Sequence, residues 1–107
     1  MALKKQYLKS KPEVRVTFEV SKEAANNASR IFLLGEFNQW EPVELDHMKN
    51  GKFKIVVKLP TDQQSSYQFR YKLCDASGKE YFENDWNADA YCPNLYGEEN
   101  SVITVTH

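Results

Sequence analysis

A tryptophan in a short loop is the first residue whose type and setting could do chemistry. Trp40 ends the run Gly-Glu-Phe-Asn-Gln-Trp (residues 35–40), which follows the apolar residues 31–34 and precedes Pro42. A short apolar run bounded by Gly and Pro predicts a buried strand that leads into a loop. Binding residues concentrate on loops held by a rigid scaffold. An exposed aromatic ring there could stack on a flat ligand such as a sugar ring, whose hydroxyls would need neighbouring hydrogen-bond partners.

Residues 83–100 form a second stretch of chemical interest. The stretch is rich in Asn, Asp, Pro and Gly, has little strand character, and is longer than most loops in compact domains. Loops of this length tend to be functional or disordered. Trp86, Tyr91 and Tyr96 argue against disorder, because large aromatic side chains usually dock on something. The sequence therefore predicts that this segment either packs over a sheet edge or lines a site.

Other site chemistries find no support in the sequence. His47, His107, Cys74 and Cys92 lack the spacing of metal ligands. There is no Gly-rich phosphate loop and no nucleophile elbow of a serine hydrolase. A glycosidase needs two carboxyl groups flanking one bond in a cleft, and the pattern of 107 residues indicates no deep cleft. We therefore expect a protein that is not an enzyme and that carries no cofactor and no metal.

Length and composition restrict the partners and the location. A chain of 107 residues is one domain by size, and a net charge of −1 creates no field that would recruit nucleic acid or a membrane. No run has the apolar length of a signal peptide core or a membrane span. We expect a cytoplasmic protein whose two cysteines are reduced thiols.

The start of the chain differs from the rest in charge. The first eleven residues contain four lysines, at positions 4, 5, 9 and 11, and no acid. A solvated terminus is the common explanation for such a segment, and a tethering arm is the alternative. We expect a basic N-terminal segment over residues 1–13 and a single domain over residues 14–107.

Apolar and polar residues alternate in several short runs, which predicts half-buried strands. The expected strands cover residues 14–20, 30–34, 43–45, 52–59, 67–73, 79–82 and 101–105. Asn50-Gly51 is a strong turn signal, and residues 21–29 read as a connection with at most one helical turn. About seven strands without a convincing helix predict an all-β fold, an immunoglobulin-like antiparallel β-sandwich.

The strand followed by Gly-x-Phe-Asn-x-Trp and Pro resembles the signature of carbohydrate-binding module family 48. That family includes the glycogen-binding domain of the AMP-activated kinase β subunit and the early-set domains of isoamylases and glucan branching enzymes. The resemblance extends from about residue 14 to residue 105. It is nearest to small stand-alone bacterial early-set proteins, which share the start Leu-Lys-Lys-x-Tyr-Leu-Lys (residues 3–9) and the run Asn-Asp-Trp-x-Ala-Asp-x-Tyr (residues 84–91).

The resemblance implies a carbohydrate-binding face made of two aromatic residues, a basic residue, a bulky capping residue and an asparagine. These positions fall on Trp40, Tyr81, Arg70, Tyr96 and Asn100, with Trp86 as a rival to Tyr81 for the second aromatic. The kinase domain carries different residues at three of the positions, which are Arg, Tyr and Tyr here. Each substitute keeps the type of chemistry that the family uses.

Each of these residues also has a structural interpretation. Trp40 could be a half-buried loop anchor, and Arg70 could be a solvated residue on a polar strand face. Tyr81 and Trp86 could belong to the core. Asn100 could simply hold its own turn.

Two functions of different kinds follow. The first is a non-catalytic module that binds an α-1,4-glucan oligosaccharide or polysaccharide, such as glycogen or starch, by stacking aromatic rings on glucose. The second is a protein-interaction or regulatory domain that accompanies a glucan-metabolising enzyme of glycoside hydrolase family 13 type and binds no glycan itself, since an exposed aromatic patch also marks protein interfaces. Stacking on RNA bases is disfavoured, because the aromatic residues lack a surrounding cluster of basic side chains.

Overall fold

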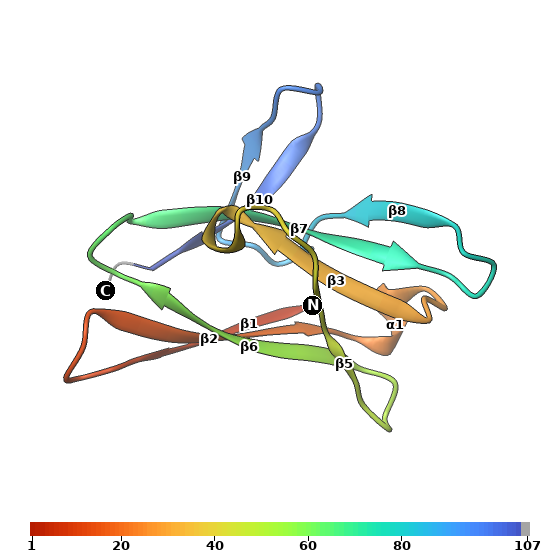
Figure 1. The fold of residues 1–107 in the computed structure, drawn as a ribbon, viewed down its shortest axis with the longest axis horizontal. Helices are drawn as coiled ribbons and strands as arrows, with labels where there is room; N and C mark the ends of the chain where they lie inside the picture. The colour runs from red at the N-terminus through yellow and green to blue at the C-terminus, as the bar shows by residue number, and fades with distance from the viewer. Residues whose placement is uncertain (106–107) are drawn as a thin grey trace.

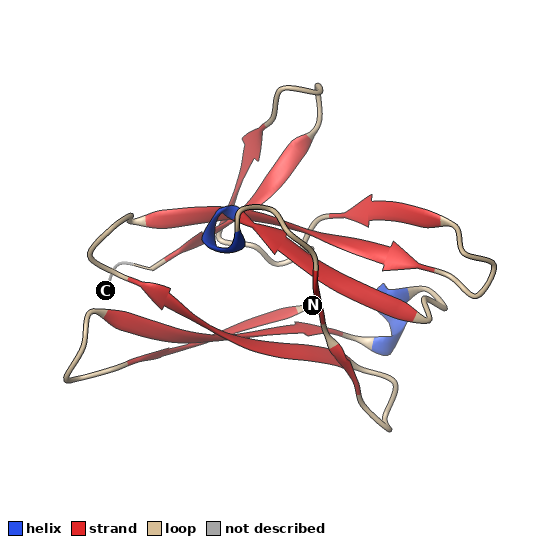
Figure 2. Cartoon of the chain, in the orientation of Figure 1, coloured by secondary structure: helices blue, strands red, loops and turns tan. Residues whose placement is uncertain are grey.

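Two antiparallel β-sheets packed face to face form the protein in the computed structural model, which describes residues 1–105 (Figure 1). His107, considered above as a metal ligand, lies outside the described residues. Strands dominate, and the helical segments are single turns (Figure 2). The elements are β1 (Ala2–Tyr7), β2 (Glu13–Val20), α1 (Lys22–Ala25), β3 (Arg30–Gly35), the 3-10 turn η1 (Glu36–Asn38), β4 (Val43–Glu44), β5 (Asp46–His47), β6 (Phe53–Pro60), β7 (Ser66–Cys74), β8 (Glu80–Glu83), β9 (Ala90–Pro93) and β10 (Glu99–Thr104).

One sheet has the strand order β1-β2-β6-β5, and the other has the order β4-β3-β7-β10-β9 with β8 also paired to β7. Strand β3 pairs along one edge of β7, from residue 69 to residue 74. The other edge of β7 is divided between two partners: β10 pairs with residues 66–69 and β8 pairs with residues 71–74. Strand β7 is therefore the central strand of the larger sheet, and strands from distant parts of the chain pair along its two edges.

The hydrophobic core lies between the two sheets. In β2 and β7 every second residue is buried, which is the alternation expected for strands with one face on a core. Phe18 of β2 meets Phe69 of β7 edge to face, with ring centroids 5.2 Å apart, so that aromatic packing joins the two layers. The predicted all-β sandwich is confirmed.

The sandwich includes residues that the sequence analysis assigned to an N-terminal tail. Strand β1 pairs with β2 from Ala2 to Tyr7, and Leu3 packs against the core. The Nζ atom of Lys5 lies 2.7 Å from the Asp89 carboxylate. The boundary expected at residue 14 therefore does not separate a tail from the sheet. The alternating apolar positions of β1 were less visible in the sequence because lysines separate them.

The segment over residues 83–100 is more regular than its composition suggested. Strand β9 lies within this segment and forms a hairpin with β10. The hairpin projects from the sandwich in Figure 1. Residues 21–29 contain the single helical turn α1, capped by Ser21, whose hydroxyl accepts a hydrogen bond from the Ala24 N–H at 3.1 Å. Within residues 1–105, no helix is long and apolar enough to cross a membrane.

Candidate functional site

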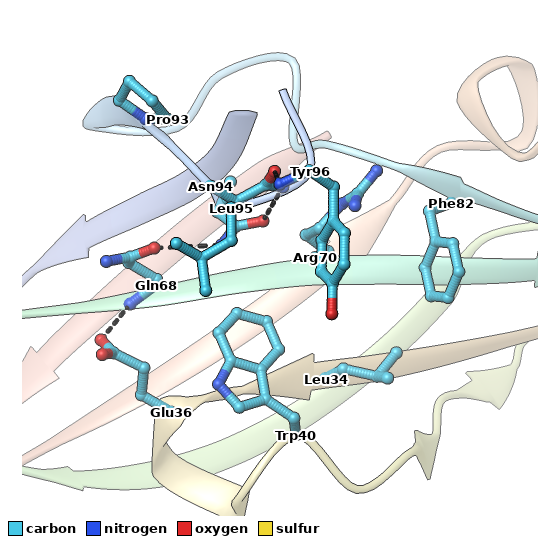
Figure 3. A pocket seen from close by; sticks show the side chains of 11 residues that line it. Leu34, Glu36, Trp40, Gln68, Arg70, Phe82, Pro93, Asn94, Leu95 and Tyr96 are labelled. Atoms are coloured by element: carbon cyan, nitrogen blue, oxygen red, sulfur yellow. Dashed lines mark hydrogen bonds between the residues drawn. The ribbon is translucent and has the colours of Figure 1, made fainter. Parts of the chain in front are cut away.

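A pocket of about 600 Å³ lies on the outer face of the larger sheet, away from the core (Figure 3). Its floor comes from β3, β7 and β8, one side from the loop after β3, and the other side from the β9–β10 hairpin. The lining residues are Leu34, Glu36, Trp40, Gln68, Arg70, Phe82, Pro93, Asn94, Leu95, Tyr96 and Asn100. Trp40, Arg70, Tyr96 and Asn100 were expected from the sequence, and the fold brings these four into one concave surface.

The loop that carries Trp40 is closed by the side chain of Asn38. The Asn38 Oδ1 atom accepts a hydrogen bond from the Gly35 N–H at 2.9 Å, and its Nδ2 donates to the Leu33 carbonyl at 3.3 Å. Gln39 and Trp40 then adopt left-handed backbone conformations, with φ of 56° and 59°. A bulky residue in this region is strained, and such strain occurs where the surrounding structure holds a functional residue in place. The loop therefore presents a Trp40 ring that is 39% exposed.

The base of this loop is anchored in the core through Phe37. The Phe37 ring lies 5.8 Å from the Phe18 ring and 6.1 Å from the Tyr67 ring, measured between centroids. Gly35 makes room for it, because a Cβ atom at this position would lie 2.6 Å from the Phe37 ring. The glycine of the sequence motif thus serves close packing, and the phenylalanine two residues later fills the space.

Arg70 projects from β7 into the pocket. Its Nη1 atom lies 3.5 Å from the Glu98 carboxylate, and its guanidinium lies 5.0 Å from the centroid of the Phe82 ring. The Arg70 Nε atom is buried and has no hydrogen-bond partner among the described residues. A buried donor without a partner costs free energy.

Asn100 belongs to a chain of amide hydrogen bonds that connects the hairpin to the sheet. Its Nδ2 atom donates to the Gln68 Oε1 at 3.0 Å, and its Oδ1 accepts from the Asn94 Nδ2 at 3.2 Å. The Asn94 Oδ1 in turn accepts the N–H groups of Tyr96 and Glu98 at 2.9 and 3.1 Å. The side chain of Asn100 is therefore a structural support of the hairpin as well as a lining group of the pocket.

The tip of the β9–β10 hairpin forms the projecting wall of the pocket. Leu95 is 99% exposed and Tyr96 is 86% exposed. In Figure 3 the Tyr96 ring reaches toward the pocket from the hairpin, while Trp40 reaches toward it from the loop after β3. The two aromatic rings thus reach the same pocket from separate segments of the chain.

Two of the residues expected at the site lie elsewhere. Tyr81 pairs with Leu73 across β8 and β7, and its half-buried ring packs against the core. Trp86 is 56% exposed on the loop before β9. Its backbone N–H donates a hydrogen bond to the Sδ atom of Met1 at 3.1 Å. Neither residue lines the pocket. The second aromatic of the floor is Phe82, the neighbour of Tyr81, which points to the outer face.

Register explains why Phe82 and not Tyr81 faces the pocket. The Asp75 N–H donates to the Lys79 carbonyl at 3.0 Å, so the turn between β7 and β8 places Tyr81 opposite Leu73. Leu73 faces the core by the alternation of β7, and residues paired across strands lie on the same face. Pairing residues across the β7–β8 turn, starting at Asp75 and Lys79, places Tyr81 on the core face and therefore Phe82 on the outer face. The other lining residues that sequence reasoning missed are Leu34, Glu36, Gln68, Pro93, Asn94 and Leu95.

A buried carboxyl group supports the loop before β9. Asp85 is fully buried, and its carboxyl accepts hydrogen bonds from the Tyr71 hydroxyl at 3.1 Å and the Asn87 N–H at 2.8 Å. Burial raises the pKa of Asp85 above its ordinary value, although these hydrogen bonds oppose the shift. Burial of the Tyr71 side chain, together with the negative charge of the neighbouring Asp85, raises the pKa of Tyr71 well above the ordinary value for tyrosine. The Tyr91 hydroxyl completes the network by donating to the Asp85 carbonyl at 2.6 Å.

The pocket combines flat apolar rings with amide, guanidinium and carboxylate groups, which suits a ligand with both C–H faces and hydroxyls. Within residues 1–105, no group of three or more His, Cys, Asp or Glu side chains could hold a metal ion. The aromatic rings that line the pocket are able to stack on a ligand, and the polar groups around them are able to form hydrogen bonds with it.

Comparison with models of known protein families finds a match over most of the chain. The model of carbohydrate-binding module 48 (isoamylase N-terminal domain) matches residues 10–92. The matched range contains the Trp40 loop, β7 and β8, and it ends before the tip of the β9–β10 hairpin. No curated protein matches the chain.

Proposed function

The chain belongs to the carbohydrate-binding module 48 family, and on that premise we propose that it binds α-1,4-glucan chains without acting on them. Trp40 stacks on one glucose ring, and Tyr96 covers the chain from the hairpin. Arg70 and Asn100 donate hydrogen bonds to the hydroxyls, and Phe82 supplies the apolar floor beside Arg70. Tyr81 and Trp86 have no part in this proposal, because both lie outside the pocket.

The observation that carries the proposal is the convergence of four residues on one pocket. Trp40, Arg70, Tyr96 and Asn100 come from three separate segments of the chain, and the fold brings all of them to the same surface. An exposed aromatic ring, an incompletely paired guanidinium and an amide side chain supply the stacking and hydrogen-bonding groups that a glucan requires. A shallow polar site of this kind predicts weak binding, with a Kd in the micromolar to millimolar range.

The test is a titration with maltoheptaose followed by isothermal titration calorimetry, which measures affinity without a tryptophan reporter. The chain contains two tryptophans, of which one lies in the pocket and one outside it, so Trp86→Ala is the matched control for Trp40→Ala. Loss of a ring that stacks on sugar removes about 1.5 to 3 kcal/mol, which weakens binding roughly 10- to 150-fold. We expect this loss in Trp40→Ala and unchanged affinity in Trp86→Ala. Folded protein that does not respond to millimolar maltoheptaose would refute the proposal.

A second candidate function rests on the hairpin tip. Leu95 and Tyr96 are nearly fully exposed side by side, and exposed apolar side chains of this size are typical of protein interfaces. In this alternative the domain docks on a glucan-metabolising enzyme. Since a domain of this kind binds no glycan itself, the wild type would not respond to maltoheptaose, and Leu95→Ser with Tyr96→Ser would abolish its binding to such an enzyme.

A further inference from the structure

The pocket contains a carboxylate that the roles assigned above do not use. Among the residues that line the pocket, Glu36 carries a negative charge and Arg70 carries a positive charge. The charge of Arg70 is already opposed by Glu98, whose carboxylate lies 3.5 Å from its Nη1 atom. Within residues 1–105, Glu36 makes no ion pair at all. Its negative charge is therefore uncompensated at the edge of the pocket.

Glu36 is held in place by one of its two oxygens. The Oε1 atom accepts a hydrogen bond from the Gln68 backbone N–H at 2.7 Å, which fixes the carboxylate against the edge of β7. Its Oε2 atom has no hydrogen-bond partner among the described residues. Figure 3 shows Glu36 below Gln68 and to the left of the Trp40 ring. A free, oriented carboxylate oxygen beside a stacking ring is placed to accept a hydrogen bond from a ligand hydroxyl.

On the proposed function as its basis, we infer that Glu36 contacts the ligand and makes the site select neutral glucans over anionic ones. A carboxylate accepts a hydrogen bond from a hydroxyl more strongly than a neutral acceptor does. The same charge repels a phosphate or carboxylate group on the sugar, and the repulsion between two unit charges about 4 Å apart is about 1 kcal/mol even in water. A glucan that carries anionic groups therefore loses a favourable contact and gains an unfavourable one.

The variant Glu36→Gln removes the negative charge of this side chain and keeps its hydrogen bond to the sheet. The glutamine oxygen can still accept the Gln68 N–H, so the loop stays attached to β7, while the negative charge is removed. Glu41→Gln is the matched control, because Glu41 is an exposed acid in the same loop that does not line the pocket. Both variants change the net charge of the protein by the same amount.

The experiment measures Kd for maltoheptaose and for maltoheptaose oxidised to glucuronate at every C6, in low salt. Uniform oxidation places a charge beside Glu36 whichever glucose occupies that position. We expect Glu36→Gln to bind maltoheptaose about five-fold more weakly, since a charge-assisted hydrogen bond becomes a neutral one. We also expect its preference for the neutral sugar to fall at least five-fold relative to the wild type. Glu41→Gln should match the wild type in both measurements.

The outcomes are distinguishable. If wild-type protein binds maltoheptaose and Glu36→Gln keeps both the affinity and the preference, the inference on Glu36 is overturned while the glucan function stands. If Glu36→Gln weakens both sugars equally and lowers the melting temperature, Glu36 is a structural residue and the inference is again overturned. If the wild type binds neither sugar, the proposed function fails and the inference fails with it.

Discussion

Asn38→Ala should both destabilise the fold and weaken the site, because the Asn38 side chain closes the loop that presents Trp40. The variant loses the hydrogen bond from the Gly35 N–H and the bond to the Leu33 carbonyl. At about 1 kcal/mol for each bond, the free energy of unfolding should fall by about 2 kcal/mol. For a domain of this size that loss lowers the melting temperature by roughly 10 °C.

The same substitution should reduce affinity by a separate route. The left-handed conformations of Gln39 and Trp40 cost about 1 to 2 kcal/mol each, and the closed loop holds them in place. Once Asn38 is removed, the loop can relax, and the fraction of molecules with Trp40 in the binding position should fall to about a tenth. The apparent Kd for maltoheptaose should rise about ten-fold, since affinity scales with the population of the competent state.

Urea denaturation and the maltoheptaose titration measure the two effects, the second at a temperature where the variant is fully folded. Asn50→Ala is the control, because the Asn50 side chain also bonds a backbone N–H, that of Lys52 at 3.0 Å, but in a turn of the other sheet. That variant should lose no more than about 1 kcal/mol and keep its affinity. An Asn38→Ala protein with wild-type stability and affinity would show that Phe37 alone fixes the loop, and would refute the reasoning.

Three further predictions concern the packing, the buried acid and the floor of the pocket. Gly35→Ala should cost about 1 to 3 kcal/mol in urea denaturation, because the new Cβ would lie 2.6 Å from the Phe37 ring; unchanged stability would contradict this close packing. The raised pKa of Asp85 means that the folded state holds its proton to higher pH than the unfolded state, so stability should fall as pH rises from the ordinary aspartate pKa through the raised one. The difference between wild type and Asp85→Asn, measured by urea denaturation across that range, should show this slope, and a constant difference would contradict it. Phe82→Ala should weaken maltoheptaose binding several-fold while Tyr81→Phe leaves it unchanged, and the reverse order would return the second aromatic position to Tyr81.

The fold was predictable because strong alternation marks the inner faces of its longest strands. Residues 14–20 and 67–73 alternate without interruption, and both runs became strands with every second residue buried. The short edge strands were not predictable in the same way. Strand β9 has four residues, most of them exposed, and it depends on pairing with β10 rather than on a pattern of its own.

The site was only partly predictable because facing direction depends on register. Trp40 and Arg70 followed from the loop motif and from alternation within one strand. The choice between Tyr81 and Phe82 needed the register across the β7–β8 turn, where an error of one residue exchanges the core face for the outer face. Gln68 lies on the same face of β7 as Arg70, so the same alternation predicts its direction. Glu36 is held at the pocket by a hydrogen bond from the distant Gln68 N–H, and no local sequence pattern predicts such a contact.

The most direct test of the central claim is a two-dimensional ¹H–¹⁵N NMR titration of the protein with maltoheptaose. The two tryptophan indole N–H groups give separate signals, one from the pocket and one from the loop before β9. We expect the signals of the Trp40 indole and of the backbone amides of Gln68 and Tyr96 to shift saturably, while the Trp86 indole signal does not move. Saturable shifts confined to Trp86 and its neighbours, or no shifts at all in a well-dispersed spectrum, would contradict the central claim.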